Sequence, residues 1–256
     1  MKIAVCVKRV AKTAEADIFI EKDGKDIKKD HLVFAINDWD SYAVREAVRL
    51  RETYGGEVTV LSIGPEESRE VLTRCLAMGA DRAIRVEEPS RKDPLLISKI
   101  IYNVLKDQSF DLIFTGVQSE DEGWGQVGVT LAKLLGFPHA TIVTFIEVLD
   151  GKIKVKRELE GGIEELLELK LPAVVTIQTG INEPKYVSLS AILEAEDKEI
   201  KELSLNEIGF SSLEPIQVSI ENLFFPPVGK MAEILKGSPD EVVNQLVEII
   251  KKKKGG

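Results

Sequence analysis

Three glycines near the middle of the chain have the spacing of a loop that binds phosphate. Gly123, Gly125 and Gly128 follow an apolar run at residues 112–115 and precede an amphipathic run at residues 129–135. A buried strand thus leads through a glycine-rich turn into a helix, whose first backbone amides are free to bind an anion. Glycine also lets the backbone approach a phosphate closely. The alternative is a strand-to-helix loop in which the glycines serve only tight packing.

Two other strand ends and one helix start suit the same ligand. Residues 6–9 and residues 63–65 each follow an apolar run, and residues 37–40 begin the first helix. Ligands of open parallel sheets bind at the carboxyl ends of the strands, so we predict an adenine-nucleotide pocket on this rim. The glycine loop is neither GxGxxG nor GxxxxGK[ST], so a standard dinucleotide site or P-loop is not indicated.

Within this pocket we expect Asp40 and Asp121 to accept hydrogen bonds from the ribose, and residues 125–128 to hold the phosphate. Simpler roles are open for several of the residues. Cys6 is typical of a small core residue, and Asn37 is typical of a helix cap.

The first half of the chain alternates between strand and helix patterns. Strands are predicted at residues 3–7, 58–63, 83–86 and 112–115, with apolar helix faces between them, and Asp93-Pro94 marks one helix start. This order predicts a doubly wound α/β fold with a mostly parallel twisted sheet. A small hairpin is expected around Asp23-Gly24.

The pattern changes after residue 136. Asp150-Gly151 joins two strand patterns into a β-hairpin, and an apolar strand follows at residues 173–177. We predict an α/β nucleotide-binding domain at residues 1–184, and a docking helix with a C-terminal arm at residues 185–256. That arm ends in a helix capped by Ser238 and is poor in core residues for its length, so we expect it to embrace a partner.

Composition narrows the class of protein. The 256 residues carry 34 basic and 43 acidic side chains, a net charge of −9, which argues against nucleic acid as a partner. No apolar segment approaches the length of about 18 residues that spans a membrane, so no direct membrane insertion is expected. With 2 cysteines and 2 histidines, neither a disulfide framework nor a metal site is indicated. We expect a soluble, cytoplasmic protein.

Seven blocks of the sequence resemble one known family, the beta subunit of electron transfer flavoprotein. The resemblance covers most of the chain and becomes loose after residue 200. The blocks are residues 5–10, 43–50, 75–82, 116–128, 157–162, 169–176 and 182–186.

The resemblance implies a function as well as a fold. Beta subunits pair with an alpha subunit, which holds most of the FAD, while the flavin faces beta. Most bury an AMP that does no redox chemistry, and electron-bifurcating relatives hold a second FAD in the same pocket. The chain would then have no catalytic residues of its own. It would form half of a carrier that takes electrons from flavin dehydrogenases to a membrane electron transfer flavoprotein–quinone oxidoreductase.

The family's cofactor residues transfer onto positions of this sequence. Thr13 corresponds to a position near the flavin where AMP-type members often have tyrosine. Asp38-Trp39 departs from the family's Asn-Pro-aromatic pattern, and residues 122–124 depart from its usual loop. The cofactor-binding residues implied are Cys6, Thr13, Asn37, Asp38, Trp39, Asp40, Ile63, Gly64, Gly116, Gln118, Asp121, Gly123, Trp124, Gly125, Gln126, Val127, Gly128 and Thr130.

The identity of the pocket nucleotide stays open between AMP and a second FAD. Thr13 and residues 126–128 are similar to the bifurcating branch, whereas Ala11-Lys12 is not, and we place AMP first. Two other classes on related folds are less favoured. Nucleotide-hydrolysing or adenylating enzymes have Ser-Gly-Gly-x-Asp-Ser where this chain has residues 8–11, and ATP-binding stress or signalling modules are much shorter.

Two residues match the family's partner-docking elements. Leu189, flanked by serines, corresponds to a leucine that inserts into client dehydrogenases, and its alternative role is helix packing. Glu164 corresponds to a carboxylate that restrains the mobility of the flavin domain, and its alternative is one more solvated charge among neighbouring glutamates.

Overall fold

The computed structural model describes residues 1–183, 185–210, 215–227, 229 and 232–254. Its chain forms two compact units, residues 1–221 and residues 222–256, which are described separately. The predicted domain boundary at residue 184 lies within the first unit, and residue 184 itself is outside the described residues.

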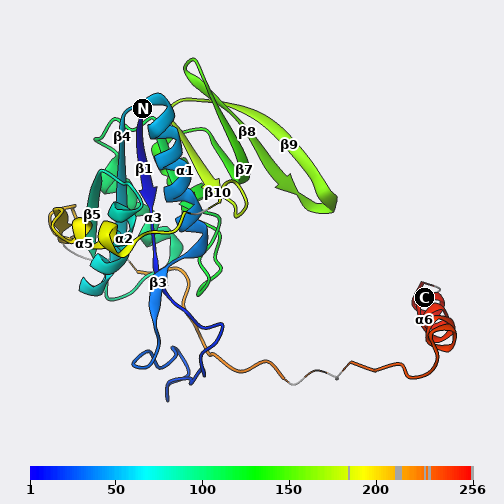
Figure 1. Cartoon of the computed structure of the whole chain (residues 1–256). Helices are drawn as coiled ribbons and strands as arrows, with labels where there is room; N and C mark the ends of the chain where they lie inside the picture. Colours follow the sequence, from blue (N-terminus) through cyan, green and yellow to red (C-terminus); the bar gives the residue numbers. More distant parts are fainter. Residues whose placement is uncertain (184, 211–214, 228, 230–231, 255–256) are drawn as a thin grey trace. The chain divides into compact units, whose positions relative to one another are not determined.

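A nine-stranded sheet in the order β11-β5-β4-β1-β6-β10-β7-β8-β9 forms the centre of the first unit (Figure 1). The strands from β11 to β7 are parallel, and β8 and β9 run antiparallel to their neighbours. The predicted doubly wound α/β fold is confirmed. The strand bounds are β1 Lys2–Cys6, β4 Glu57–Gly64, β5 Arg82–Glu87, β6 Leu112–Gly116, β7 His139–Leu149, β8 Lys152–Leu159, β9 Ile163–Lys170, β10 Ala173–Ile177 and β11 Ile200–Leu203.

Helices cover both faces of this sheet. Side chains alternate along β1, so that Ile3 and Val5 face one hydrophobic core while Ala4 and Cys6 face the other. α1, α2 and α5 contribute to the first core, and α3 and α4 to the second. The helix bounds are α1 Asp38–Tyr54, α2 Arg69–Ala77, α3 Pro94–Leu105, α4 Val127–Leu135 and α5 Leu189–Glu196.

Local capping signals explain several element ends. Asp93 accepts a hydrogen bond from the backbone N–H of Leu96 at 2.7 Å, and Pro94 occupies the first helical position of α3, as predicted. Gly136 ends α4 in the left-handed conformation. The expected hairpin near Asp23-Gly24 contains the antiparallel bridge between Ile20 and Ile27.

Three strand pairs were not predicted. β9 was missed because Glu and Leu dominate residues 163–170, a composition that favours helix, whereas pairing with β8 makes the segment a strand. β11 joins the edge of the sheet beside β5, inside the segment predicted to be an arm. A separate two-stranded sheet pairs β2 Arg9–Ala11 with β3 Phe34–Ile36.

The second unit contains the helix α6 Pro239–Lys254. Glu241 accepts hydrogen bonds from the backbone N–H and the hydroxyl of Ser238 at 2.8 and 2.9 Å, which confirms the predicted start of this helix. Its apolar side chains at Val243, Leu246 and Ile250 are exposed. No helix among the described residues is long and apolar enough to cross a bilayer.

Candidate nucleotide pocket

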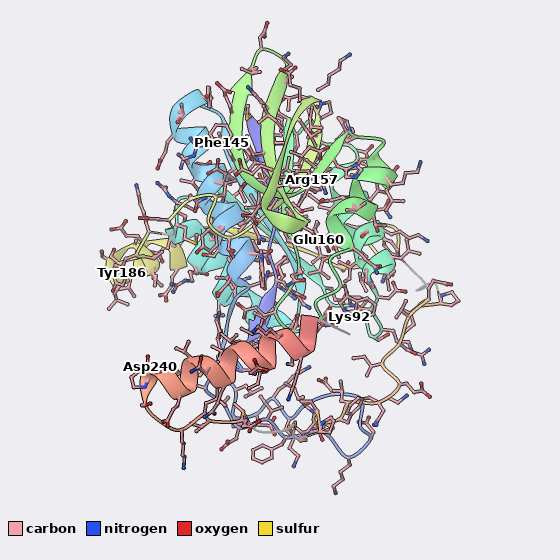
Figure 2. All side chains as sticks on the ribbon, turned by 90° about the vertical axis from the view of Figure 1, so that its right-hand side faces the viewer. Lys92, Phe145, Arg157, Glu160, Tyr186 and Asp240 are labelled. Atoms are coloured by element: carbon pink, nitrogen blue, oxygen red, sulfur yellow. The ribbon has the colours of Figure 1, made fainter. Side chains whose placement is uncertain are left out.

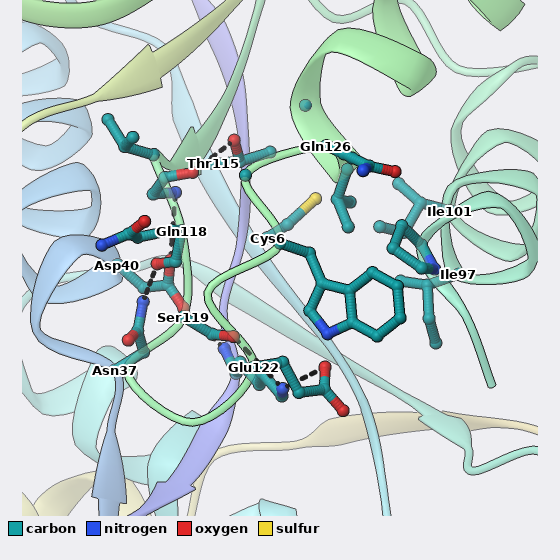
Figure 3. Close-up of a pocket in the computed structure, with 18 of the residues that line it drawn as sticks. Cys6, Asn37, Asp40, Ile97, Ile101, Thr115, Gln118, Ser119, Glu122 and Gln126 are labelled. Carbon is teal, nitrogen blue, oxygen red and sulfur yellow. Dashed lines mark hydrogen bonds and ion pairs between the residues drawn. The ribbon is translucent and has the colours of Figure 1, made fainter. Parts of the chain in front are cut away.

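A cavity of about 140 Å³ opens at the carboxyl ends of β1, β4 and β6 (Figure 3). From β1 the chain crosses to β4, which is the neighbour of β1 on one side, and it later returns to β6, which is the neighbour on the other side. β1 and β6 therefore flank the topological switch point. Open α/β sheets bind ligands at this place. The structure therefore brings together most of the residues that the sequence predicted for a pocket.

Two buried polar side chains at the start of α1 hold the strand ends together. Asp40 accepts hydrogen bonds from the backbone N–H groups of Lys8 at 2.8 Å and Gly116 at 3.0 Å. Asn37 donates to the carbonyl of Gln118 at 2.8 Å and accepts from the backbone N–H of Glu120 at 3.0 Å. Asn37 does not cap α1 with its side chain. Both residues thus shape the pocket by fixing the backbone after β1 and β6.

The Asp40 carboxyl group has an altered acidity. Burial raises the pKa of Asp40 to about 7, although hydrogen bonds from the backbone of Lys8 and Gly116 and from Asn37 oppose the change. Both carboxylate oxygens already accept backbone hydrogen bonds. Asp40 is therefore a structural residue of the pocket wall rather than a dedicated ribose acceptor.

Stability should depend on pH through this group. In the unfolded chain aspartate titrates near pH 4, so between about pH 4 and pH 7 the folded protein binds a proton that the unfolded chain has lost. The free energy of unfolding should fall as the pH rises through this window, by about 4 kcal/mol. Urea unfolding at several pH values should show that Asp40→Asn loses this slope. Asp38→Asn, at an exposed neighbour, should keep it, and equal slopes in all three proteins would contradict the assignment.

The N-terminus of α4 forms one side of the cavity. Residues 125–128 line it, and Gln126 at the cap position makes no side-chain hydrogen bond to the helix amides. Gly125 has a φ of +62°, which favours glycine. A β-carbon at Gly128 would lie 2.6 Å from Thr176 Cγ2 and 2.7 Å from Thr115 Oγ1, so glycine lets α4 approach the sheet. This uncapped helix start fits a phosphate.

The wall of the cavity that α3 forms is apolar. Ile97 and Ile101 of α3 line it, and Figure 3 shows them across the cavity from Asn37, Asp40 and Gln118. Cys6, Ile63 and Trp124 also line the cavity. Burial raises the pKa of the Cys6 thiol to about 12, so this cysteine is a neutral wall residue and not a nucleophile. An apolar slot beside a helix N-terminus suits an adenine ring with a phosphate.

Ion pairs hold the loop between β6 and α4. The Lys8 ammonium lies 2.8 Å from Asp121 and 2.7 Å from Glu122. Lys12 lies 2.8 Å from Asp38 and 3.4 Å from Glu120. Burial acts to raise the pKa of Asp121, but the charge and hydrogen bond of Lys8 lower it overall. Asp121 is thus paired with a lysine and lies outside the cavity lining, rather than being a free ribose acceptor.

Eleven of the eighteen predicted cofactor residues line the cavity, and the other seven do not. Trp39 donates a hydrogen bond from its indole N–H to Gln178 at 2.8 Å. A β-carbon at Gly64 would meet Ser68, so Gly64 serves packing with the following turn. Thr13 and Asp38 are exposed. The residues outside the lining are Thr13, Asp38, Trp39, Gly64, Asp121, Gly123 and Thr130.

Sequence reasoning missed the α3 wall of the pocket. In the sequence, Ile97 and Ile101 belong to the apolar face that follows the helix start at Asp93-Pro94, and such a face is typical of packing against a sheet. This apolar face is wide, because Ile97 and Ile101 join Leu96 and Ile100 in packing against the second core, and this width was the available signal. Val7 and Lys8 belong to the strand end at residues 6–9, and Val117, Ser119 and Glu122 belong to the glycine loop, both of which were expected to border the pocket. The lining residues that were not predicted at all are Lys92, Asp93, Pro94, Ile97, Ile101 and Thr115.

Comparison with known proteins identifies the family. Residues 27–208 match the family described as electron transfer flavoprotein domain. The chain is 37% identical to the electron transfer flavoprotein subunit beta of Methylophilus methylotrophus over 100% of both chains. It is 37% identical to the subunit beta of Bacillus subtilis, covering 98% of each, and 33% identical to that of Homo sapiens, covering 97% and 98%. The chain belongs to the family of electron transfer flavoprotein beta subunits. The resemblance seen in the sequence is thereby confirmed, together with an electron-transfer role in a flavoprotein.

The two residues expected to contact partners of this electron transfer flavoprotein lie on the surface. Leu189 begins α5 and is 68% exposed, and Ser188 caps the helix by accepting a hydrogen bond from the backbone N–H of Ala191. Tyr186 precedes Leu189 by three residues, and its side chain is 91% exposed (Figure 2). Glu164 lies on β9 and pairs with Lys156 at 3.1 Å. Leu189 is thus largely exposed among the described residues, and Glu164 is an exposed, paired charge.

Proposed function

We propose that this chain pairs with an alpha subunit that holds FAD. The heterodimer is cytoplasmic, and it carries electrons from flavin dehydrogenases to a membrane electron transfer flavoprotein–quinone oxidoreductase. The observation that carries this proposal is the cavity at the switch point of a chain that belongs to the beta-subunit family. The beta chain contributes binding surfaces and supplies no catalytic residue. FAD, when bound by the pair, supplies the redox chemistry.

The pocket ligand that we propose is AMP. One uncapped helix N-terminus at residues 125–128 provides amides for one phosphate, and the wall of Ile97 and Ile101 accommodates the adenine. A second FAD, as in electron-bifurcating relatives, is the alternative, and its pyrophosphate would need a further donor. The two lysines that line the cavity are paired with carboxylates, which favours the single phosphate.

The stoichiometry of released cofactors tests this proposal. The heterodimer is purified with its alpha subunit and denatured, and the released nucleotides are separated by chromatography and quantified. One FAD and one AMP per heterodimer would support the AMP form. Two FAD per heterodimer would establish the bifurcating alternative instead. Release of no adenine compound besides a single FAD would contradict the nucleotide pocket.

The proposed partner surfaces explain the exposed apolar side chains. On α6, Val243 is 57% exposed and Leu246 is 48% exposed, on a helix whose other side is charged. An amphipathic helix with an uncovered apolar side is typical of an element that packs against another chain. We propose that this segment embraces the alpha subunit and that Leu189 docks dehydrogenases. We also propose that Glu164 restrains the mobility of the flavin domain, and that Thr13 lies near the flavin.

The chain purified without its alpha subunit should bind little FAD and be poorly stable. The apolar side of α6 would then remain in water, and no surface of a second chain would complete the flavin site. Absorbance of bound flavin and urea unfolding, measured for the chain alone and for the heterodimer, check this expectation. Tightly held, stoichiometric FAD on the isolated chain would contradict it.

A further inference from the structure

Both lysines that line the nucleotide pocket are already paired with carboxylates of this chain. The ammonium of Lys8 lies 2.8 Å from Asp121 Oδ1 and 2.7 Å from Glu122 Oε2, and also 3.3 Å from the Ser119 hydroxyl. Lys92 lies 2.6 Å from Glu88. Sites for nucleoside di- and triphosphates present a free cation to the outer phosphates, as the lysine of a P-loop does. Here the Lys8 ammonium is paired with loop carboxylates and is not available as a free cation for an outer phosphate.

The charges around the cavity also disfavour a second phosphate. The lining contains the two lysines and three carboxyl groups, those of Asp40, Asp93 and Glu122. Asp121, next to this lining, adds a carboxylate that is paired directly with Lys8. Each additional phosphate charge would therefore be placed near carboxylates rather than near an unpaired cation, which disfavours it electrostatically. The first phosphate is an exception because the amides of α4 hold it.

Contacts with Asn37 and Lys12 keep the loop that carries these carboxylates in position. Asn37 anchors the start of the loop through Gln118 and Glu120, and Lys12 pairs with the Glu120 carboxylate. The loop is therefore held at one end by partly buried hydrogen bonds, and its carboxylates at 121 and 122 lie against Lys8.

We propose that Asp121 and Glu122 determine the phosphate specificity of the pocket, because by holding Lys8 they restrict it to an adenine nucleotide with a single phosphate. This inference rests on the proposed function, in which the pocket binds an adenine nucleotide. The two carboxylates act through Lys8 and are positioning residues. Their removal frees an ammonium at the cavity wall for the β-phosphate of ADP or ATP.

Competition between nucleotides measures this specificity directly. The FAD-loaded heterodimer is equilibrated with an equimolar mixture of AMP, ADP and ATP without divalent cations and passed through gel filtration. The nucleotides bound are then counted by chromatography after denaturation. We expect the wild-type protein to prefer AMP over ATP by about tenfold or more, and the double variant Asp121→Asn with Glu122→Gln to lose about tenfold of that preference.

Glu120→Gln is the matched control. It removes one negative charge from the same loop, but this carboxylate pairs with Lys12 and does not line the cavity. It should keep the wild-type preference. A further variant, Lys8→Met, removes the freed cation, so adding Glu122→Gln to Lys8→Met should no longer change the preference.

The outcomes separate the inference from the proposed function. Equal binding of AMP, ADP and ATP by the wild-type heterodimer would overturn the specificity and leave the nucleotide pocket intact. An unchanged preference in the double variant, or an equal change in Glu120→Gln, would also overturn it. Binding of none of the three nucleotides would overturn both the inference and the proposed AMP site.

Discussion

Gly128→Val is expected to lower the free energy of unfolding by about 3 kcal/mol or more and to remove nucleotide from the pocket. A β-carbon at this position would lie 2.6 Å from Thr176 Cγ2 and 2.7 Å from Thr115 Oγ1, so α4 must move away from the sheet to admit it. The amides at the start of α4 move with the helix, and the phosphate loses its donors. Urea unfolding of the heterodimer and the nucleotide content after denaturation measure the two effects.

Two further substitutions show whether close packing is the cause. Gly128→Ala introduces only the β-carbon and should fall between the wild-type protein and Gly128→Val in both measurements. Gly123→Ala tests the loop itself, because Gly123 has a φ of +62° but nothing within 4 Å of its added β-carbon. It should cost about 1 kcal/mol and retain nucleotide. Full nucleotide content in Gly128→Val would show that α4 does not hold the ligand.

Leu189→Ala is expected to weaken binding of a client dehydrogenase about thirtyfold. A large apolar side chain that is 68% exposed and held at a capped helix start has the properties of an interface anchor. Truncation of such an anchor costs about 2 kcal/mol, which corresponds to that change in affinity. The rate of flavin reduction by the dehydrogenase, measured against the concentration of the heterodimer, gives the apparent affinity.

The same variant should leave other properties unchanged. Its FAD content, its melting temperature and its reduction by a small-molecule reductant should equal those of the wild-type protein, since Leu189 packs little against the fold. Leu166→Ala is a control at a leucine on β9 that is 53% exposed, and it should keep the dehydrogenase affinity. An equal loss in both variants, or a large drop in melting temperature, would remove Leu189 from the docking site.

Local signals made most of the fold predictable. The helix start at Asp93-Pro94 and the tight turn at Asp150-Gly151 depend on residues adjacent in the sequence, and both are present in the structure. β9 and β11 were not predictable in this way. Their residues include strong helix formers and charged side chains, and they become strands because of neighbouring strands distant in the chain.

The candidate site shows the same division. Residues 125–128 were predictable from the spacing of their glycines before a helix, and Asn37 from its place at the start of the first helix, both on the rim where parallel sheets place ligands. The roles of Asp40 and Asp121 were harder to predict from the sequence. Asp40 holds backbone N–H groups after two strands, and Asp121 pairs with Lys8, 113 positions away in the sequence. Contacts of this kind depend on the folded arrangement and leave no pattern of spacing.

The edge strand β9 has a consequence for how the protein behaves at high concentration. Unpaired backbone groups at a sheet edge can template the addition of a strand from another copy, which leads to aggregation. β9 carries three glutamates and one lysine in eight residues, and Glu164 and Glu168 pair with lysines of β8. A second β9 laid alongside would place like charges close together, so this edge is protected against self-association. The sheet can therefore end in an exposed strand at β9 without offering that edge to a second copy of the chain.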